Sequence, residues 1–293
     1  MLNTELSRIN NAFRGTNIQP EHPQDPNSVD TFVEFEWATT DPDGQPLARP
    51  GVHVVTTDRS SYSENIITSV SENNPCWTHF WDPNKYLNVW VLSVPNAGWG
   101  GLGTYPALHD NPVYERPKYL YGSWVNTSAA LEVLLHEFGH NLGLRHVFKG
   151  GGLSTDHISL TESCSSDADG CNDTPNYHRD RYIYERLRTS CEGNTFHSTN
   201  HMDYGDGAMN SFTYDQRKII RTTVEKGIWI PIPRNRGARF ATGTDAPLNL
   251  QPPRIEPCER NGTKVFGLEV LPGCWTRTIS LSRESRTNPE KFD

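Results

Sequence analysis

The sequence predicts an α+β fold in which a few helices and short strands precede and follow a long irregular region. Runs rich in aromatic and β-branched residues predict three strands, over residues 31–37, 86–92 and 119–125. Apolar residues at helical spacing predict four helices, over residues 4–14, 66–70, 131–142 and 213–226. Between the last two helices, a glycine run at residues 150–152 opens an irregular region that extends to about residue 199.

Length and charge limit the domain organisation and the partners. The chain of 293 residues suffices for one large domain or two small ones, and it has no apolar run of about 18 residues that could span a membrane. A net charge of −8 argues against nucleic acid as a partner, and the oligomeric state stays open. Acidic residues outnumber basic ones up to residue 231 and the reverse holds beyond it, which predicts a domain boundary there.

One helical run carries side chains that can hold a metal ion. His136 and His140 are four residues apart, so both rings project from the same side of the helix. Gly143 can adopt the left-handed conformation that ends a helix, and the chain can then bring His146 back as a third ligand. Three protein ligands with a fourth position open for water predict a catalytic zinc site, in which Glu137 reaches the water. The alternative is a chance match on a core helix.

The extended motif, His-Glu-x-x-His-x-x-Gly-x-x-His, resembles that of the metzincin metalloproteases. A second block is similar to the methionine-containing turn, the Met-turn, of the pappalysin family within that clan, and differs from it only at His201. This block is Asn200-His201-Met202-Asp203-Tyr204. Other family-like blocks lie at residues 41–44, 87–91, 101–106 and 173–175. The resemblance runs from near residue 5 to about residue 225 and does not cover the tail.

The resemblance implies a zinc-dependent endopeptidase with proteins or peptides as substrates. Residues 1–231 would form the catalytic domain. Residues 1–146 would be its N-terminal subdomain, with a mixed twisted sheet and the active-site helix. Residues 147–231 would be an irregular C-terminal subdomain with the Met-turn and a terminal helix. Residues 232–293 would be an extension, either small and β or partly disordered.

Three side chains receive roles in the chemistry. Glu137 is expected to act as a general base and then as an acid. By resemblance, Met202 would lie beneath the zinc histidines as an apolar floor. The hydroxyl of Tyr204 could donate to the oxyanion, and the alternative is a tyrosine that only packs.

A glycine-rich segment is expected to bind the substrate. In resembling proteins it is an edge strand over the cleft, whose free backbone groups pair with an extended peptide, and the alternative is a flexible loop. The residues concerned are Gly101, Leu102, Gly103 and Thr104. Some relatives also favour a basic residue after the cleaved bond through an acidic side chain behind the Met-turn, which would be Asp206 here.

An acidic segment is a candidate calcium site. By resemblance the ligands would be Asp169, the carbonyl of Asn172, and Thr174, and oxygens of these kinds are the hard ligands that calcium takes. The alternative is an ordinary acidic turn.

Six scattered cysteines favour disulfides, and therefore an oxidising, extracellular compartment. By resemblance Cys191 would pair with Cys164, with Cys171 as the rival partner. The chain opens on polar residues without a signal peptide. Because resembling proteins have an apolar strand before the first helix, and usually a signal and a propeptide before that, we expect a trimmed chain.

Two other functions stay open. A zinc-binding but non-catalytic adhesion or inhibitor-like module would be favoured by the loss of Glu137, which is present. A latent form would be held by a prosegment outside this chain and would need activation. The histidines outside the motif, His201 among them, are expected to be surface or loop residues.

Overall fold

The computed structural model describes most of the chain up to residue 231 and three short strands beyond it. The described residues are 2–16, 25–63, 79–108, 121–127, 129, 131–149, 169–178, 186–205, 209–228, 230–231, 263–266, 275–276 and 280–284. The helix expected around residues 66–70 lies outside them. The helices within these ranges are α1 (Leu2–Phe13), α3 (Leu131–Asn141) and α4 (Tyr214–Lys226). The strands that bear on the site are β1 (Glu34–Glu36), β2 (Val89–Leu92), β3 (Gly101–Gly103) and β5 (Ser123–Asn126).

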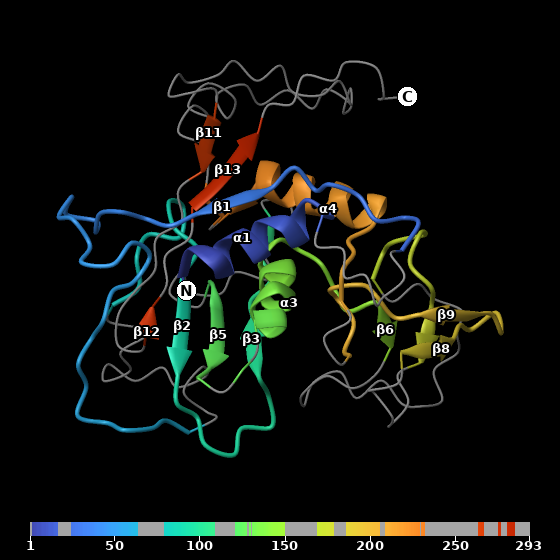
Figure 1. Ribbon diagram of the computed structural model, residues 1–293, viewed down its shortest axis with the longest axis horizontal. Helices are drawn as coiled ribbons and strands as arrows, with labels where there is room; N and C mark the ends of the chain where they lie inside the picture. Colours follow the sequence, from blue (N-terminus) through green and yellow to red (C-terminus); the bar gives the residue numbers. More distant parts are fainter. Residues whose placement is uncertain are drawn as a thin grey trace.

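A four-stranded sheet supports the N-terminal half of the fold, with the strand order β12-β2-β5-β3 (Figure 1). Strands β2 and β5 are parallel, and β3 pairs antiparallel with β5 at one end of the sheet. At the other end β12 (Trp275–Thr276) adds antiparallel to β2. The glycine-rich segment is therefore an edge strand, as expected.

The two faces of this sheet carry different cores, because side chains alternate along a strand. On one face Trp90 and Trp124 are buried and stack, with ring centroids 4.8 Å apart. On the other face the sheet packs against α3, whose Phe138 belongs to a larger cluster. In that cluster Phe35 lies 5.0 Å from Phe138 and 4.9 Å from Phe13, between ring centroids. Aromatic side chains thus join α1, β1 and α3.

The strand expected over residues 31–37 is shorter in the structure, because β1 covers only Glu34–Glu36. Phe32 has a φ of 57°, in the left-handed region, so the chain cannot be extended there. Asn10 of α1 then holds the strand from the helix side. Its Nδ2 donates to the carbonyl of Phe35 at 2.9 Å, and its Oδ1 accepts from the Phe35 N–H at 2.8 Å.

The described parts of the tail are three strands, two of which pair with strands that precede residue 231. Strand β13 (Ser280–Glu284) lies between β1 and β11 (Thr263–Phe266) in a three-stranded antiparallel sheet. The strand β12, mentioned above, pairs with β2. A domain boundary near residue 231 stays a prediction.

The described part of the chain between α3 and α4 has little regular structure. It contains two small sheets, formed by β6 (Phe148–Lys149) with β7 (Tyr177–His178) and by β8 (Leu187–Thr189) with β9 (Thr195–His197). Strand β10 (Gly227–Ile228) follows α4 and pairs with β4 (Ala107–Leu108). Together with the helices and the sheet, this arrangement confirms the expected α+β fold.

Helix α4 confirms the expected terminal helix and begins at a complete capping box. The hydroxyl of Thr213 accepts from the N–H of Gln216, and the Gln216 side chain accepts from the N–H of Thr213. None of the helices in the described part of the chain has the length and apolar character that a membrane crossing requires.

Candidate metal centre

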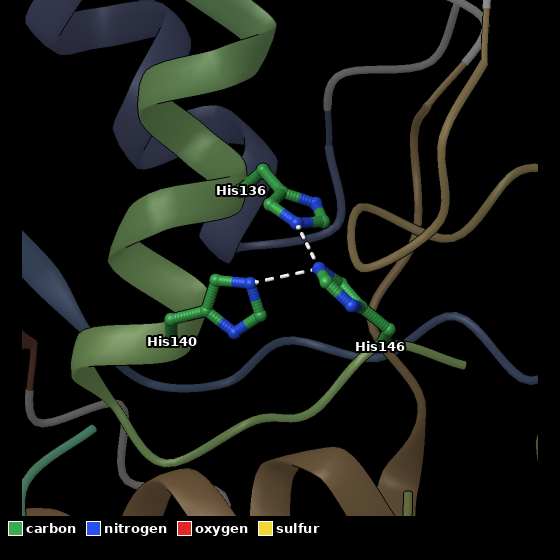
Figure 2. Close-up of side chains that lie close together, drawn as sticks. All are labelled: His136, His140 and His146. Atoms are coloured by element: carbon green, nitrogen blue, oxygen red, sulfur yellow. Dashed lines mark hydrogen bonds between the residues drawn. The ribbon is translucent and has the colours of Figure 1, made fainter. Parts of the chain in front are cut away.

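Three histidines converge at the end of α3. His136 and His140 point to one side of the helix, where His146 approaches from the following loop (Figure 2). The Nε2 of His146 lies 3.0 Å from the Nε2 of His136 and 3.1 Å from that of His140. Each residue offers one ligand atom, and the three atoms lie within 4.8 Å of one another. Three imidazole nitrogens around one point are a donor set that fits a zinc ion with an open fourth position.

Gly143 makes the return of His146 possible, as the sequence predicts. Its φ is 91°, and the N–H of the next residue, Leu144, turns back to the carbonyl of Gly139 at 2.9 Å. A Cβ atom at position 143 would lie 2.4 Å from the hydroxyl oxygen of Thr223 in α4. Glycine is therefore required here by the backbone conformation and by the close approach of α4.

The second ring nitrogen of each helical histidine is held by a backbone carbonyl. Nδ1 of His136 lies 2.8 Å from the carbonyl of His201, and Nδ1 of His140 lies 2.8 Å from that of Leu144. Since a carbonyl only accepts, Nδ1 carries the proton and Nε2 presents its lone pair to the centre.

Burial keeps these rings neutral, which is the form that binds a metal. It lowers the pKa of His140 to about 4. It also lowers the pKa of His136 well below its usual range, an effect to which the neighbouring His140 and His146 add.

The structure corrects the expectation for His201. Its side chain is only 2% exposed, and its ring lies 4.7 Å from that of Phe212, between centroids. Its carbonyl orients His136. A polar residue in an irregular segment gives no periodic pattern, so only its position beside Met202 in the Met-turn could have indicated a buried site.

Glu137 lies on α3 beside the histidines and beneath β3. It is 5% exposed, and burial raises the pKa of its carboxyl to about 8, whereas a hydrogen bond from the N–H of Gly103 lowers it. A Cβ atom on Gly101 would lie 2.9 Å from Oε1 of Glu137, and one on Gly103 would lie 3.0 Å from Oε2. A carboxyl whose pKa lies near neutral pH can take up and return a proton.

Met202 lies against α3 at the expected place. It is fully buried, and a Cβ atom on Gly139 would lie only 2.2 Å from its sulfur. The methionine therefore passes where the helix has no side chain, next to the ligand His140. Asn200 holds this turn, because its Oδ1 accepts from the N–H of Met202 and from Nε2 of Gln216, each at 2.9 Å.

Tyr204 borders His136 and His146, so the structure brings it to the three-histidine centre. Its ring centroid lies 4.9 Å from that of His146 and 5.3 Å from that of His136. It also packs against Phe148 at 4.9 Å. An aromatic side chain at this distance can place its hydroxyl at the cleft.

A buried ion pair lies behind the Met-turn, and nothing in the sequence pattern indicated it. Arg188 of β8 lies 3.5 Å from the carboxylate of Asp203, between Nε and Oδ2, and both side chains are less than a tenth exposed. Arg188 also donates to the backbone carbonyl of Tyr204. The hydroxyls of Tyr177 and Ser198 donate to the same carboxylate.

The residues proposed for calcium lie in a separate loop before β7. The hydroxyl of Thr174 donates to the carboxylate of Asp169, at 2.9 and 3.1 Å to its two oxygens, and lies 3.0 Å from the carbonyl of Cys171. Asn172 is exposed, and its N–H donates to Asp215 at 3.0 Å. The carbonyl near Thr174 is thus that of Cys171.

Two other expectations depend on residues outside the described ranges. Asp206 lies in such a gap, so its place in the cleft stays a prediction. Cys191 is disulfide-bonded, whereas Cys171 is a buried thiol. Cys171 is thereby eliminated as the partner of Cys191, and pairing with Cys164 stays a prediction.

The fold and the three-histidine centre define a metallopeptidase, a hydrolase of proteins or peptides that uses zinc. The chain belongs to the pappalysin family, Peptidase_M43, described as that of pregnancy-associated plasma protein-A, whose model matches residues 71–225. None of the curated proteins matches the chain.

Solved structures of mirolysin are similar in fold. Mature mirolysin of Tannerella forsythia in complex with a cleaved peptide is 24% identical, with a TM-score of 0.56 over 74% of this chain and 81% of that one. Mirolysin in complex with compound 9 is also 24% identical, with a TM-score of 0.58 over 76% and 83%.

Proposed function

We propose that the protein is a zinc-dependent endopeptidase in which Glu137 is the general base. One observation carries the proposal: a buried carboxyl lies on the helix that provides two converging histidines, directly beneath an open sheet edge. His136, His140 and His146 would hold the zinc ion. When bound, zinc polarises the scissile carbonyl and lowers the pKa of a water molecule.

The protein's own groups then have separate tasks. Glu137 takes a proton from the attacking water and passes it to the leaving amine. Tyr204, whose ring borders the histidines, donates its hydroxyl to the oxyanion. Met202 supports the histidines from below.

The residues that would bind the substrate are the edge strand β3, which consists of Gly101, Leu102 and Gly103, and the next residue, Thr104. Among the described residues β3 has one strand neighbour, β5, so its other side can pair with an extended peptide. Asp206 would select a basic residue after the cleaved bond. Recognition of backbone predicts that unfolded segments of many sequences are cleaved.

The test compares the wild type with Glu137→Ala and Glu137→Gln. Zinc content is measured by elemental analysis, and cleavage is measured on a denatured protein. About one zinc per chain in all three forms, with cleavage only by the wild type, is expected. Cleavage by Glu137→Ala at the wild-type rate would falsify the role of Glu137. Zinc binding without cleavage in the wild type would instead favour a non-catalytic module or a latent form.

The proposal includes calcium and an extracellular location. The hydroxyl of Thr174 lies within hydrogen-bond distance of the Asp169 carboxylate and of the Cys171 carbonyl, so oxygens of the kind that calcium takes gather in this loop. The disulfide at Cys191 supports an oxidising compartment. Calcium is tested by a calcium titration of the melting temperature of the wild type and Asp169→Ala. An equal shift in both would remove calcium from the proposal.

A further inference from the structure

Asn141 is the last residue of α3 and directly follows the ligand His140. Its side chain is buried, at 3% exposure. The amide Nδ2 donates to the carbonyls of Thr104 and Gly122, both at 2.9 Å, and Oδ1 accepts from the hydroxyl of Ser123. Both ends of the amide are therefore hydrogen-bonded to backbone or side chains of other elements.

These partners come from two strands. Thr104 follows β3 directly, while Gly122 and Ser123 mark the start of β5. The strands are also joined there, because Thr104 donates its N–H to the carbonyl of Gly122 at 3.0 Å and its hydroxyl accepts from the N–H of Gly122 at 2.9 Å. The end of the zinc helix, the end of the edge strand and the start of its neighbour thus meet at Asn141.

The hydrogen-bond pattern of β3 shows which groups its open side presents. The carbonyl of Gly100 accepts from Asn126, and the N–H of Thr104 donates to Gly122, so these residues face β5. In an antiparallel pair the alternate residues face away, which here are Gly101 and Gly103. The hydrogen bond from Gly103 to Glu137 agrees with this assignment.

We propose that Asn141 is a positioning residue that sets the place of the open edge of β3 relative to the zinc histidines; this inference rests on the proposed function. An edge strand has a partner strand on one side only, and Asn141 adds a restraint from the helix. Because the same residue follows His140, a displacement of β3 is coupled to the metal ligands. A misplacement of about 1 Å can lower a catalytic rate by about a hundredfold.

No residue of similar size or chemistry at position 141 can make the same hydrogen bonds. Aspartate would place acceptors against the two carbonyls that Nδ2 now satisfies, and leucine would leave both carbonyls without this donor. Glutamine is longer by one methylene and would push β3 away. The chain also offers a matched control, because Asn10 joins α1 to β1 by two comparable hydrogen bonds, at 2.9 and 2.8 Å.

The experiment compares Asn141→Ala and Asn141→Asp with Asn10→Ala and the wild type. Each is assayed for zinc content and for kcat and KM on two substrates that share one cleaved bond. One is a long peptide that extends on both sides of this bond, and the other is a blocked dipeptide. For Asn141→Ala we expect kcat/KM on the long peptide to fall at least about tenfold, mainly through KM, with less than about a threefold change on the dipeptide. Zinc is retained, and Asn10→Ala stays within about twofold on both substrates.

The inference would be overturned if kcat/KM of Asn141→Ala matched that of Asn10→Ala on both substrates. It would also be overturned if Asn141→Ala lost kcat/KM equally on the long peptide and on the dipeptide. If Asn141→Ala does not fold, Ser123→Ala, which removes the hydroxyl that orients the amide, should show a smaller loss confined to the long peptide. Binding of the long peptide to Glu137→Gln is measured as well, with and without Asn141→Ala. About tenfold weaker binding in the double variant is expected, and equal binding refutes the inference. A wild type that does not cleave counts against the proposed function, while this binding comparison still decides the role of Asn141.

Discussion

The two walls of the metal centre are built in different ways. The wall formed by α3 and β3 is held by close backbone packing, with glycines where the strand lies on the helix. The wall formed by the Met-turn has little regular structure and is held by buried polar side chains, such as the Arg188–Asp203 ion pair. Polar networks in a low-dielectric interior are stable only when every member is satisfied.

This difference indicates whether a substitution in each wall should reduce activity first or stability first. In the first wall a single added carbon atom displaces β3, so activity should be lost before stability. In the second wall the loss of one charge leaves another one buried, so stability should be lost first. The variants below test this contrast.

The largest effect is expected for Arg188→Ala. Without the guanidinium the carboxylate of Asp203, which is 4% exposed, keeps a buried charge with no cation beside it. Breaking a buried pair in this way costs about 3–5 kcal/mol. Urea unfolding of the zinc-loaded protein measures the loss. A loss below about 1 kcal/mol in Arg188→Ala would contradict the described network.

The next effect is expected for Gly103→Ala in the other wall. The added Cβ would lie 2.6 Å from the backbone carbonyl oxygen of Glu137 and 3.0 Å from Cβ of His140, neither of which can move freely. We expect kcat/KM on a long peptide to fall about a hundredfold, which is about 2.7 kcal/mol, with zinc retained. Gly100→Ala is the control, since its Cβ meets only the side chain of Val133, at 3.2 Å. Equal activity of the two variants would argue against close packing of β3 on α3.

A third effect concerns pH and His201. Burial lowers the pKa of His201 to about 3, from 6.5 in the unfolded chain. Below pH 6.5 the unfolded state therefore binds the proton more readily, and stability present above pH 6.5 is lost as the pH falls. One such group contributes a slope of about 1.4 kcal/mol per pH unit, between roughly pH 6.5 and 3.

His201→Phe should reduce the pH dependence of the zinc-free protein by the share of this one group, while His136 and His140, whose pKa values burial also lowers, keep their shares. The measurement is urea unfolding at pH 7, 6 and 5 with a chelator present. His197→Phe, at an exposed site in β9, should keep the wild-type dependence. If His201→Phe keeps it too, the loss of stability at low pH arises elsewhere.

The smallest effect is expected at the surface where α1 meets α3. Arg8 and Glu132 form an ion pair at 2.9 Å, with side chains 55% and 29% exposed. Such pairs contribute little, so Arg8→Ala should change the free energy of unfolding by less than about 0.5 kcal/mol. A change as large as that of Arg188→Ala would show that burial does not distinguish the two pairs.

The same contrast explains what the sequence could predict. The zinc helix, the edge strand and α4 carry periodic or motif-bound residues, such as the histidines four apart, and these elements were predicted correctly. The contacts of Asn141 reach residues 18 to 37 positions away, and those of Arg188 reach Asp203 and Tyr204, 15 and 16 positions away. Contacts of this kind leave no local pattern, because their partners are chosen by the fold. The shortening of β1 at Phe32 likewise could not be predicted from the sequence, because the positive φ of this phenylalanine is imposed by its surroundings in the fold.

The hydrogen bonds of Gln216 link the unwinding of α4 to the loss of the metal. Its side-chain oxygen accepts from the N–H of Thr213 at the start of α4, and its amide is paired in both directions with Asn200. One side chain thus connects the first turn of the last helix to the floor under the metal. Unwinding of that turn on heating should release zinc in the same step. A copy in which this turn has unwound would then lose its peptidase activity together with its zinc, and would not remain as a partly unfolded but active protease.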